Sequence, residues 1–286
     1  MDLERLIGEF EEQQRTFQNI NKLLREIFKL DKNRNENLPK IRQAISKLKD
    51  VANSVQMVET SAHNLTKWIS QYESEVTNAE EEIRKQFGAK LEKELGKLGL
   101  SLSGQYPELK AGLFTIELDF DKWKATLWYG PKQEHLVQCP LSVSKIAHQL
   151  EKERQQLGSR LPENQLLEKI GEAYYRVVGM KRGENAPIIG ENAPIIRVLA
   201  ELSYLLQSPD FLQDPKRENY RSYSRADFSY DLFRIQRFQK EAHSLSQIQL
   251  TIATLTHTKR RSDFLWVPYD EHGKGTAYSH LKFEKV

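Results

Sequence analysis

Apolar residues recur at alternating steps of three and four along the start of the chain, from Leu3 to Ile27. Gln13 is the one polar residue on this stripe. Such spacing is typical of the a and d positions of a coiled coil, whereas a helix of a globular domain has a broader apolar face. The stripe consists of Leu3, Leu6, Phe10, Phe17, Ile20, Leu24 and Ile27.

A second apolar stripe follows a polar break at residues 31–37 and Pro39, which suits a first helical turn. It runs from Ile45 to Ile83 and changes phase at Val58, as a stammer does in a coiled coil. The two stripes predict a long antiparallel coiled-coil hairpin over residues 1–98. At about 1.5 Å per residue, its arms are about 40 Å and about 70 Å long.

The shorter arm covers only about half of the longer one. We therefore expect a second copy or another protein to bind the uncovered part of the second stripe. The alternative is that this part packs against the rest of the same chain. The predicted partner-binding residues are Leu65, Ile69, Tyr72, Val76 and Ile83.

Glycines at 96, 99 and 104 end the helical periodicity, and we place a domain boundary near residue 99. The run 113–120 alternates apolar and polar residues, which is typical of a half-buried strand. Two more strand-like runs follow, at 124–129 and 134–139, joined by a turn that contains Gly130 and Pro131. Residues 99–141 are therefore predicted to form a β-meander.

Residues 142–208 are predicted to be helical, with helices that begin after Ser142, around Pro162 and around Pro194. Between the second and third helix, the heptapeptide GENAPII occurs twice in tandem, at 183–189 and 190–196. We expect a duplication that is accommodated in a loop. The alternative is that the extra copy lengthens a recognition loop.

Residues 209–286 form a basic and aromatic, strand-rich segment. The run 228–235 fits either a strand or a helix. Alternating patterns predict strands at 247–256, 262–267 and 276–283, with a hairpin turn before the last one. Helices followed by an antiparallel hairpin are compatible with a winged-helix-like arrangement. The predicted fold class is α+β, with a helical hairpin at 1–98 and a mixed domain at 99–286.

Composition narrows the functional classes. The 286 residues are 38% hydrophobic and 29% charged, and the formal net charge of +3 requires any nucleic-acid contact to be local. The single cysteine excludes a disulfide framework and a cysteine-based zinc site. We expect neither a signal peptide nor a membrane span. We also expect the protein to be cytoplasmic.

The strongest functional signal is the positive charge between residues 212 and 262, a stretch that contains ten Lys or Arg and only five Asp or Glu. Tyr220, Tyr223 and Tyr230 are interleaved with the arginines, and this combination suits phosphate contact and base stacking. The alternative is that Arg225, Asp227, Asp231 and Arg234 pair internally and that the other charges form a solvated face. The predicted nucleic-acid-binding residues are Lys216, Arg217, Arg221, Arg225, Arg234, Arg237, Lys259, Arg260 and Arg261.

Catalytic signals are weak. Glu117, Asp119 and Asp121 lie together at a strand end, and paired carboxylates bind Mg²⁺ in nucleases. The acid-x-Lys element of the common restriction-type nucleases is missing beside them. The seven histidines show no metal-ligand spacing, and no cofactor is expected.

These observations favour a non-enzymatic subunit of a multi-protein complex. Its coiled coil would bind a protein partner or a second copy, and its C-terminal segment would contact DNA or RNA. One alternative is a metal-dependent nuclease that uses Glu117, Asp119 and Asp121. A further alternative is a purely structural scaffold.

Overall fold

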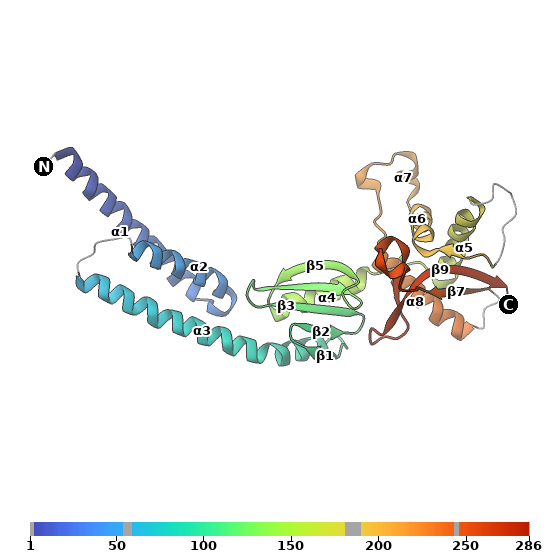
Figure 1. Ribbon diagram of the computed structural model, residues 1–286, viewed down its shortest axis with the longest axis horizontal. Helices are drawn as coiled ribbons and strands as arrows, with labels where there is room; N and C mark the ends of the chain where they lie inside the picture. Colours follow the sequence, from blue (N-terminus) through green and yellow to red (C-terminus); the bar gives the residue numbers. More distant parts are fainter. Residues whose placement is uncertain (1–2, 54–58, 181–189, 243–245, 286) are drawn as a thin grey trace. The chain divides into compact units, whose positions relative to one another are not determined.

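The computed structural model describes residues 3–53, 59–180, 190–242 and 246–285. Within these ranges the fold is mixed, with eight α-helices and two antiparallel sheets (Figure 1). The chain divides into two compact units. We call residues 1–94, 119–123 and 141–144 the helical unit, and residues 95–118, 124–140 and 145–286 the C-terminal unit.

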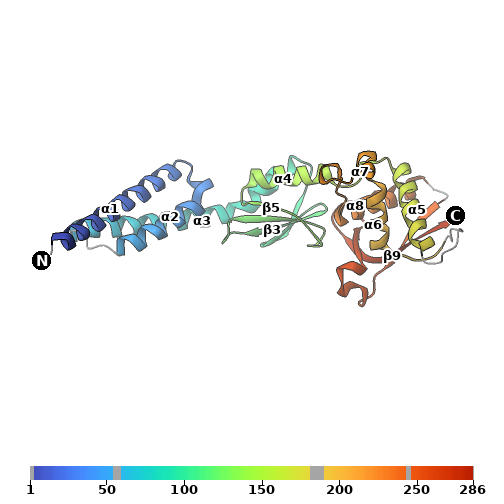
Figure 2. The same ribbon diagram turned by 90° about the horizontal axis from the view of Figure 1, so that it is seen from above.

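The helical unit is built from α1 (Leu3–Asp31), α2 (Arg34–Asn53) and most of α3 (Glu59–Gly96). Helices α1 and α2 lie side by side, as Figures 1 and 2 show. All three helices contribute apolar side chains to one core, because the stripes at helical spacing face one another. The buried members are Ile20, Ile27, Leu38, Ile41, Ala44, Ile45, Leu48, Ile69, Tyr72 and Val76.

Polar contacts at the edge of this core connect α3 to the other two helices. The Tyr72 hydroxyl donates a hydrogen bond to Asp31, and the Arg34 Nε donates to the same carboxylate at 2.7 Å. The hydrogen bond from Arg34 lowers the pKa of Asp31. Burial, together with the bond to Asp31, raises the pKa of Tyr72 to about 12. Lys49 adds an exposed ion pair with Glu73 at 2.5 Å.

The second helical segment differs from its prediction in two ways. The break after α1 is shorter than expected, since α2 begins at Arg34 and contains Pro39. The Asn37 side chain caps this junction by donating to the carbonyls of Leu30 and Asn33 at 3.3 and 3.1 Å. The predicted long arm is described as two helices, α2 and α3, and the expected phase change at Val58 lies outside the described residues.

Glu80 on α3 is a charged residue of the helical unit with incomplete hydrogen bonding. One of its oxygens pairs with Arg42 at 2.6 Å, whereas Oε1 is buried without a hydrogen-bond partner. Burial raises the pKa of Glu80, and the nearby Arg42 and Arg84 only partly oppose this shift.

We expect Glu80→Gln to raise the melting temperature of the protein at pH 7. A carboxyl whose folded-state pKa is raised gives stability that is lost as the pH rises through that pKa. The amide has no charge to desolvate, so the advantage of the variant should disappear once both states are protonated, below about pH 4. Thermal unfolding followed by circular dichroism at several pH values measures this. A lower melting temperature at pH 7 would mean that the pair with Arg42 outweighs desolvation.

The first sheet of the C-terminal region is an antiparallel meander in the order β1-β2-β3-β4-β5. Its longest regular pairing joins β4 to β5 with a register shift at Leu127 and Trp128. Figures 1 and 2 show α4 (Val143–Gln156) lying along this sheet, and Ile146, Ala147 and Leu150 of α4 are buried. The strands are β1 (Leu102–Gln105), β2 (Glu108–Ala111), β3 (Phe114–Asp119), β4 (Lys124–Tyr129) and β5 (Glu134–Pro140).

The second sheet is centred on β9 (Gly275–Lys285), which pairs with β6 (Ala193–Pro194), β7 (Ser246–Ile252) and β8 (Leu265–Pro268). Tyr278 pairs with both Ile252 of β7 and Leu265 of β8. Because a strand has only two edges, β7 occupies one edge of β9, and β8 and β6 both pair with its other edge. Helices α5 (Glu163–Met180), α6 (Ile195–Leu205) and α8 (Arg225–Ala242) share one apolar core with this sheet. A short helix, α7 (Pro209–Gln213), follows α6.

The tandem heptapeptide is partly built into this second sheet. Its first copy, residues 183–189, lies outside the described residues. The second copy begins at Gly190 and is described. The second copy supplies β6 and the first turn of α6, with Ala193 and Ile195 fully buried. Tyr174 of α5 donates to the Glu191 carbonyl at 2.8 Å. The expectation that the duplication lies in a loop is therefore wrong for the second copy.

Candidate nucleic-acid interface

The structure divides the nine predicted basic residues into those used inside the fold and those displayed at the surface. Arg225, at the start of α8, is mostly buried and pairs with Glu134 of β5 at 2.6 Å. It also donates to the carbonyls of Arg261 and Phe264 at 2.7 and 2.8 Å. Arg225 therefore connects α8 to the meander and fixes the chain that leads into β8.

Arg234, further along α8, also forms contacts inside the fold. It donates to Asp231 at 3.1 Å, to Glu163 at 2.7 Å and to the Leu161 carbonyl at 2.9 Å. Its guanidinium lowers the pKa of Glu163 through this hydrogen bond. Neither Arg225 nor Arg234 is available for phosphate contact, so the prediction is wrong for these two residues.

Four more of the predicted residues are engaged but closer to solvent. Arg221 donates to the Ser159 carbonyl at 2.7 Å, and Lys216 pairs with Asp214 at 2.5 Å. Arg237 pairs with Glu271, and Arg261 pairs with Glu134. Exposed pairs of this kind contribute little to stability and exchange readily with other anions.

The remaining three, Arg217, Lys259 and Arg260, are exposed and form no ion pair with any residue that the structure describes. Lys259 and Arg260 belong to residues 253–264, which connect β7 to β8 and which we call the β7–β8 segment. This segment has regular local bonds, including Thr258 N–H to the Thr254 carbonyl at 3.1 Å. Arg225 holds its far end, so the paired arginines position the segment that displays the free cations.

The tyrosines predicted to stack on bases are divided in the same way. Tyr223 is buried and donates to Asp231 at 2.8 Å, and Tyr230 packs beside Phe233 with ring centroids 6.5 Å apart. Tyr220 alone of the three is exposed, with its ring 5.7 Å from that of Phe211. Two of the three rings therefore serve packing.

A buried carboxylate, Asp231, lies beneath this region. The alternative of internal pairing is confirmed for Asp231 and Arg234, whereas the complete burial of Asp231 was not predicted. Its side chain is 0% exposed and accepts from the Ser159 N–H, the Tyr223 hydroxyl and Arg234. Burial raises its pKa, against the effect of these hydrogen bonds. Gly158 approaches so closely that a Cβ there would lie 2.6 Å from Asp231 Oδ1. An Asp in a helical run with alternating charges gives no sequence signal for such a role.

A polar groove of about 700 Å³ lies at the start of α8. Its lining includes His135, Glu153, Arg160, Arg221 and Asp227, so both charge signs are present. Asp227 caps α8 by accepting from the Ser224 N–H at 2.7 Å, which occupies the helix N-terminus with a carboxylate. The groove therefore lacks the open N-terminus that binds phosphate in other proteins.

The three carboxylates of the nuclease alternative each have partners. Glu117 accepts from Trp128 Nε1 at 3.0 Å and from Lys132 at 2.7 Å. Asp119 accepts from the N–H of Lys122 at 2.9 Å, and this bond lowers its pKa. Asp121 lies 3.7 Å from Arg84. In the described ranges, no group of three or more His, Cys, Asp and Glu is arranged to hold a metal ion.

The predicted partner-binding ridge is covered by its own unit. Ile69, Tyr72 and Val76 are buried in the core that α1, α2 and α3 share. Leu65 and Ile83 are partly buried against that core. The premise of a bare ridge is wrong here, because α2 and α1 together cover more of α3 than one short arm would.

Comparison with known proteins gives no further assignment. No protein-family model, curated protein or solved structure matches the chain. None of the helices in the described ranges is long and apolar enough to cross a membrane.

Proposed function

We propose that this protein is a non-enzymatic subunit of a multi-protein complex. Its helical unit, in the manner of a coiled coil, would bind another chain, and its C-terminal unit would contact DNA or RNA through Lys259 and Arg260. The observation that carries the proposal is that these two cations are exposed on the β7–β8 segment. Arg225 holds this segment by hydrogen bonds to the carbonyls of Arg261 and Phe264.

The order of elements supports a winged-helix-like reading of the C-terminal unit. Apart from the short helix α7 and strand β8, which pairs with β9, the order is α5, β6, α6, α8, β7 and β9. The sheet order is β6-β9-β7. In this reading the β7–β8 segment is part of the wing, and α8 has the position of a recognition helix.

Helix α8 is poorly suited to enter a major groove. Phe228, Leu232 and Ile235 are buried in the core, and the arginines at 225 and 234 are engaged with carboxylates. A recognition helix needs an exposed face that reaches base edges. The wing is therefore the part of this unit best placed to touch a nucleic acid, and contact through two cations would position the backbone without reading sequence.

We expect the double variant Lys259→Ala, Arg260→Ala to bind nucleic acid more weakly than the native protein, and by a similar factor for unrelated sequences. Removing two phosphate contacts should also reduce the slope of log affinity against log salt by roughly two. Fluorescence anisotropy with a labelled DNA duplex, and with single-stranded RNA of the same sequence, measures both effects across a salt titration.

A matched control removes two exposed lysines from the helical unit, Lys67→Ala with Lys90→Ala. It changes net charge equally and should leave the slope close to that of the native protein. If both double variants lose affinity alike, the contact is diffuse and the wing has no special role. Absence of binding by the native protein at low salt would favour a structural scaffold. Mg²⁺-dependent cleavage that is lost in Asp119→Ala would favour the nuclease.

A further inference from the structure

Helix α1 carries large apolar side chains that its own unit leaves exposed. Ile7, Phe17 and Phe28 are 50%, 47% and 71% exposed, whereas Ile20 and Ile27 on the same helix point into the core. At about 100° per residue, the three exposed side chains lie within about 80° of one another around the helix. They lie on one outer face of α1, beside the one that packs inside the unit, and the exposed Gln14 and Asn21 lie between them on this face.

The spacing of this face is symmetric about its middle. Ile7 precedes Phe17 by ten residues, and Phe28 follows Phe17 by eleven. If two copies of α1 pack antiparallel around a two-fold axis at Phe17, Ile7 of each copy meets Phe28 of the other. A two-fold interface requires such self-complementarity, because the same patch is used by both copies.

The charges beside this face change sign along the helix. In its N-terminal half, Glu4, Glu11 and Glu12 are exposed beside the exposed base Arg15. In its C-terminal half, Lys22, Arg25 and Lys29 are exposed beside the exposed acid Glu26. Glu4, Glu11, Lys22 and Lys29 lie within about 20° of one another around α1. Glu11 also lies 4.0 Å from Arg15, in a pair in which both side chains are mostly exposed.

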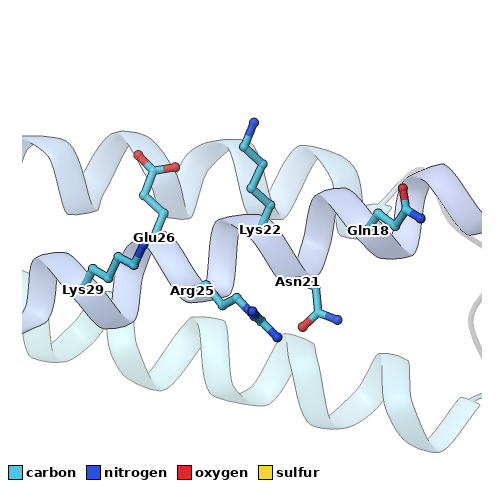
Figure 3. A pocket seen from close by; sticks show the side chains of 6 residues that line it. All are labelled: Gln18, Asn21, Lys22, Arg25, Glu26 and Lys29. Carbon is cyan, nitrogen blue, oxygen red and sulfur yellow. The ribbon is translucent and has the colours of Figure 1, made fainter.

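Antiparallel packing brings the two halves together. With Phe17 at the axis, Glu11 of one copy is level with Leu23 of the other. Lys22 and Arg25 are then within about 3 Å of that level, measured along the helix axis. Glu4 is level with the turn that contains Lys29 by the same arithmetic. Figure 3 shows Lys22, Arg25 and Lys29 along the receiving half, where they line a groove of about 590 Å³ together with Glu26, Gln18 and Asn21.

We propose that a second copy of this chain docks antiparallel on α1, with Phe17 at the two-fold axis and Ile7 against Phe28 at both ends. Two helices of this length pack over about 40 Å and bury on the order of 1,000 Å², which is the lower range for a specific interface. The inference rests on the proposed interaction role of the helical unit and names its partner.

Light scattering coupled to size exclusion tests the mass of the full chain in solution. We expect the native protein to have twice its chain mass of 33.4 kDa, and Phe17→Glu and Phe28→Glu to be monomers with unchanged circular dichroism. Leu255→Glu, at a side chain 87% exposed in the C-terminal unit, is the matched control and should stay dimeric. A monomeric native protein at micromolar concentration, or dimeric Phe17→Glu, would overturn the proposal.

Charge reversal tests the pairing between halves. Lys22→Glu alone should weaken the dimer several-fold, because it places like charges opposite each other twice per dimer. Adding Glu11→Lys should restore the dissociation constant toward the native value. If the second substitution weakens the dimer further, Glu11 and Lys22 do not face each other and the proposed register is wrong.

Crosslinking tests the direction of packing. In a Cys139→Ser background, Ile7→Cys and Phe28→Cys proteins are mixed and oxidised, and a disulfide forms only where Cα atoms come within about 7 Å. We expect mixed dimers that join position 7 to position 28. Dimers that join position 7 to position 7 would mean parallel packing and would overturn the inference.

Failure of this inference can be told apart from failure of the proposed function. Nucleic-acid binding that depends on Lys259 and Arg260 in a monomeric native protein would remove only the dimer. Native dimers with no nucleic-acid affinity would keep the dimer and remove the wing contact.

Discussion

Replacing Asp231 by alanine is expected to destabilise the C-terminal unit by about 3–5 kcal/mol, which is typical when one member of a buried charged pair is removed. The substitution leaves the Arg234 guanidinium, the Tyr223 hydroxyl and the Ser159 N–H without their shared acceptor. Tyr223 and Ser159 are buried, so water replaces this acceptor only at a cost. Denaturant unfolding followed by circular dichroism measures the loss.

Two controls separate this buried carboxylate from an ordinary ion pair on the same helix. Asp231→Asn keeps an acceptor for Ser159 and Tyr223 and should lose less stability than Asp231→Ala. Arg237→Ala breaks the exposed pair with Glu271 and should cost less than about 1 kcal/mol. Equal losses for Asp231→Ala and Arg237→Ala would show that the buried network has no special weight.

The exposure of the basic residues could not be predicted from their charge pattern. Arg225 finds Glu134 at a separation of 91 residues, and Arg234 finds Glu163 at a separation of 71. A local count of charges has no information on partners so far away. The same count included Lys259 and Arg260, which are exposed in the structure, and their contact with nucleic acid stays a prediction.

The regular elements of the C-terminal unit were predicted well wherever apolar periodicity was strong. Strands β3, β4 and β5 and helix α6 lie close to their expected bounds. Strands β1 and β2 were missed, since β1 is an edge strand with almost no buried residue. Edge strands of this kind lack the alternation on which such predictions depend.

In the helical unit, the periodic stripes predicted several of the buried residues but not how they are covered, and Phe17, which the first stripe also contains, is 47% exposed. Ile69 and Val76 were correctly placed on the apolar face of a helix. The predicted hairpin had one continuous arm after Pro39. In that arrangement only the first, shorter arm could pack against the segment that forms α3. With α2 and α3 as separate helices, the stripe of α3 is covered from within the unit, and α1 has Ile7, Phe17 and Phe28 exposed.

Trp266 joins the two sheets of the C-terminal unit. It is 6% exposed, and its ring packs edge-on against Tyr129 of β4 with centroids 5.6 Å apart. Gly130 and Gly275 make room for the indole, since a Cβ at either position would lie 2.7 or 2.6 Å from its ring atoms. The Ser229 hydroxyl of α8 donates to the Trp266 carbonyl at 2.6 Å, which connects the same point to the helix.

We therefore expect Trp266→Ala to cost about 3–5 kcal/mol, the range for a large aromatic side chain removed from a close-packed core. Trp266→Phe should lose clearly less, because a smaller ring still fills part of the space. Gly130→Ala provides an independent test, since its positive φ of 65° and the collision with the indole both oppose a side chain there. Denaturant unfolding of the three variants measures the effect. A loss below about 1 kcal/mol for Trp266→Ala would mean that the sheets are joined elsewhere.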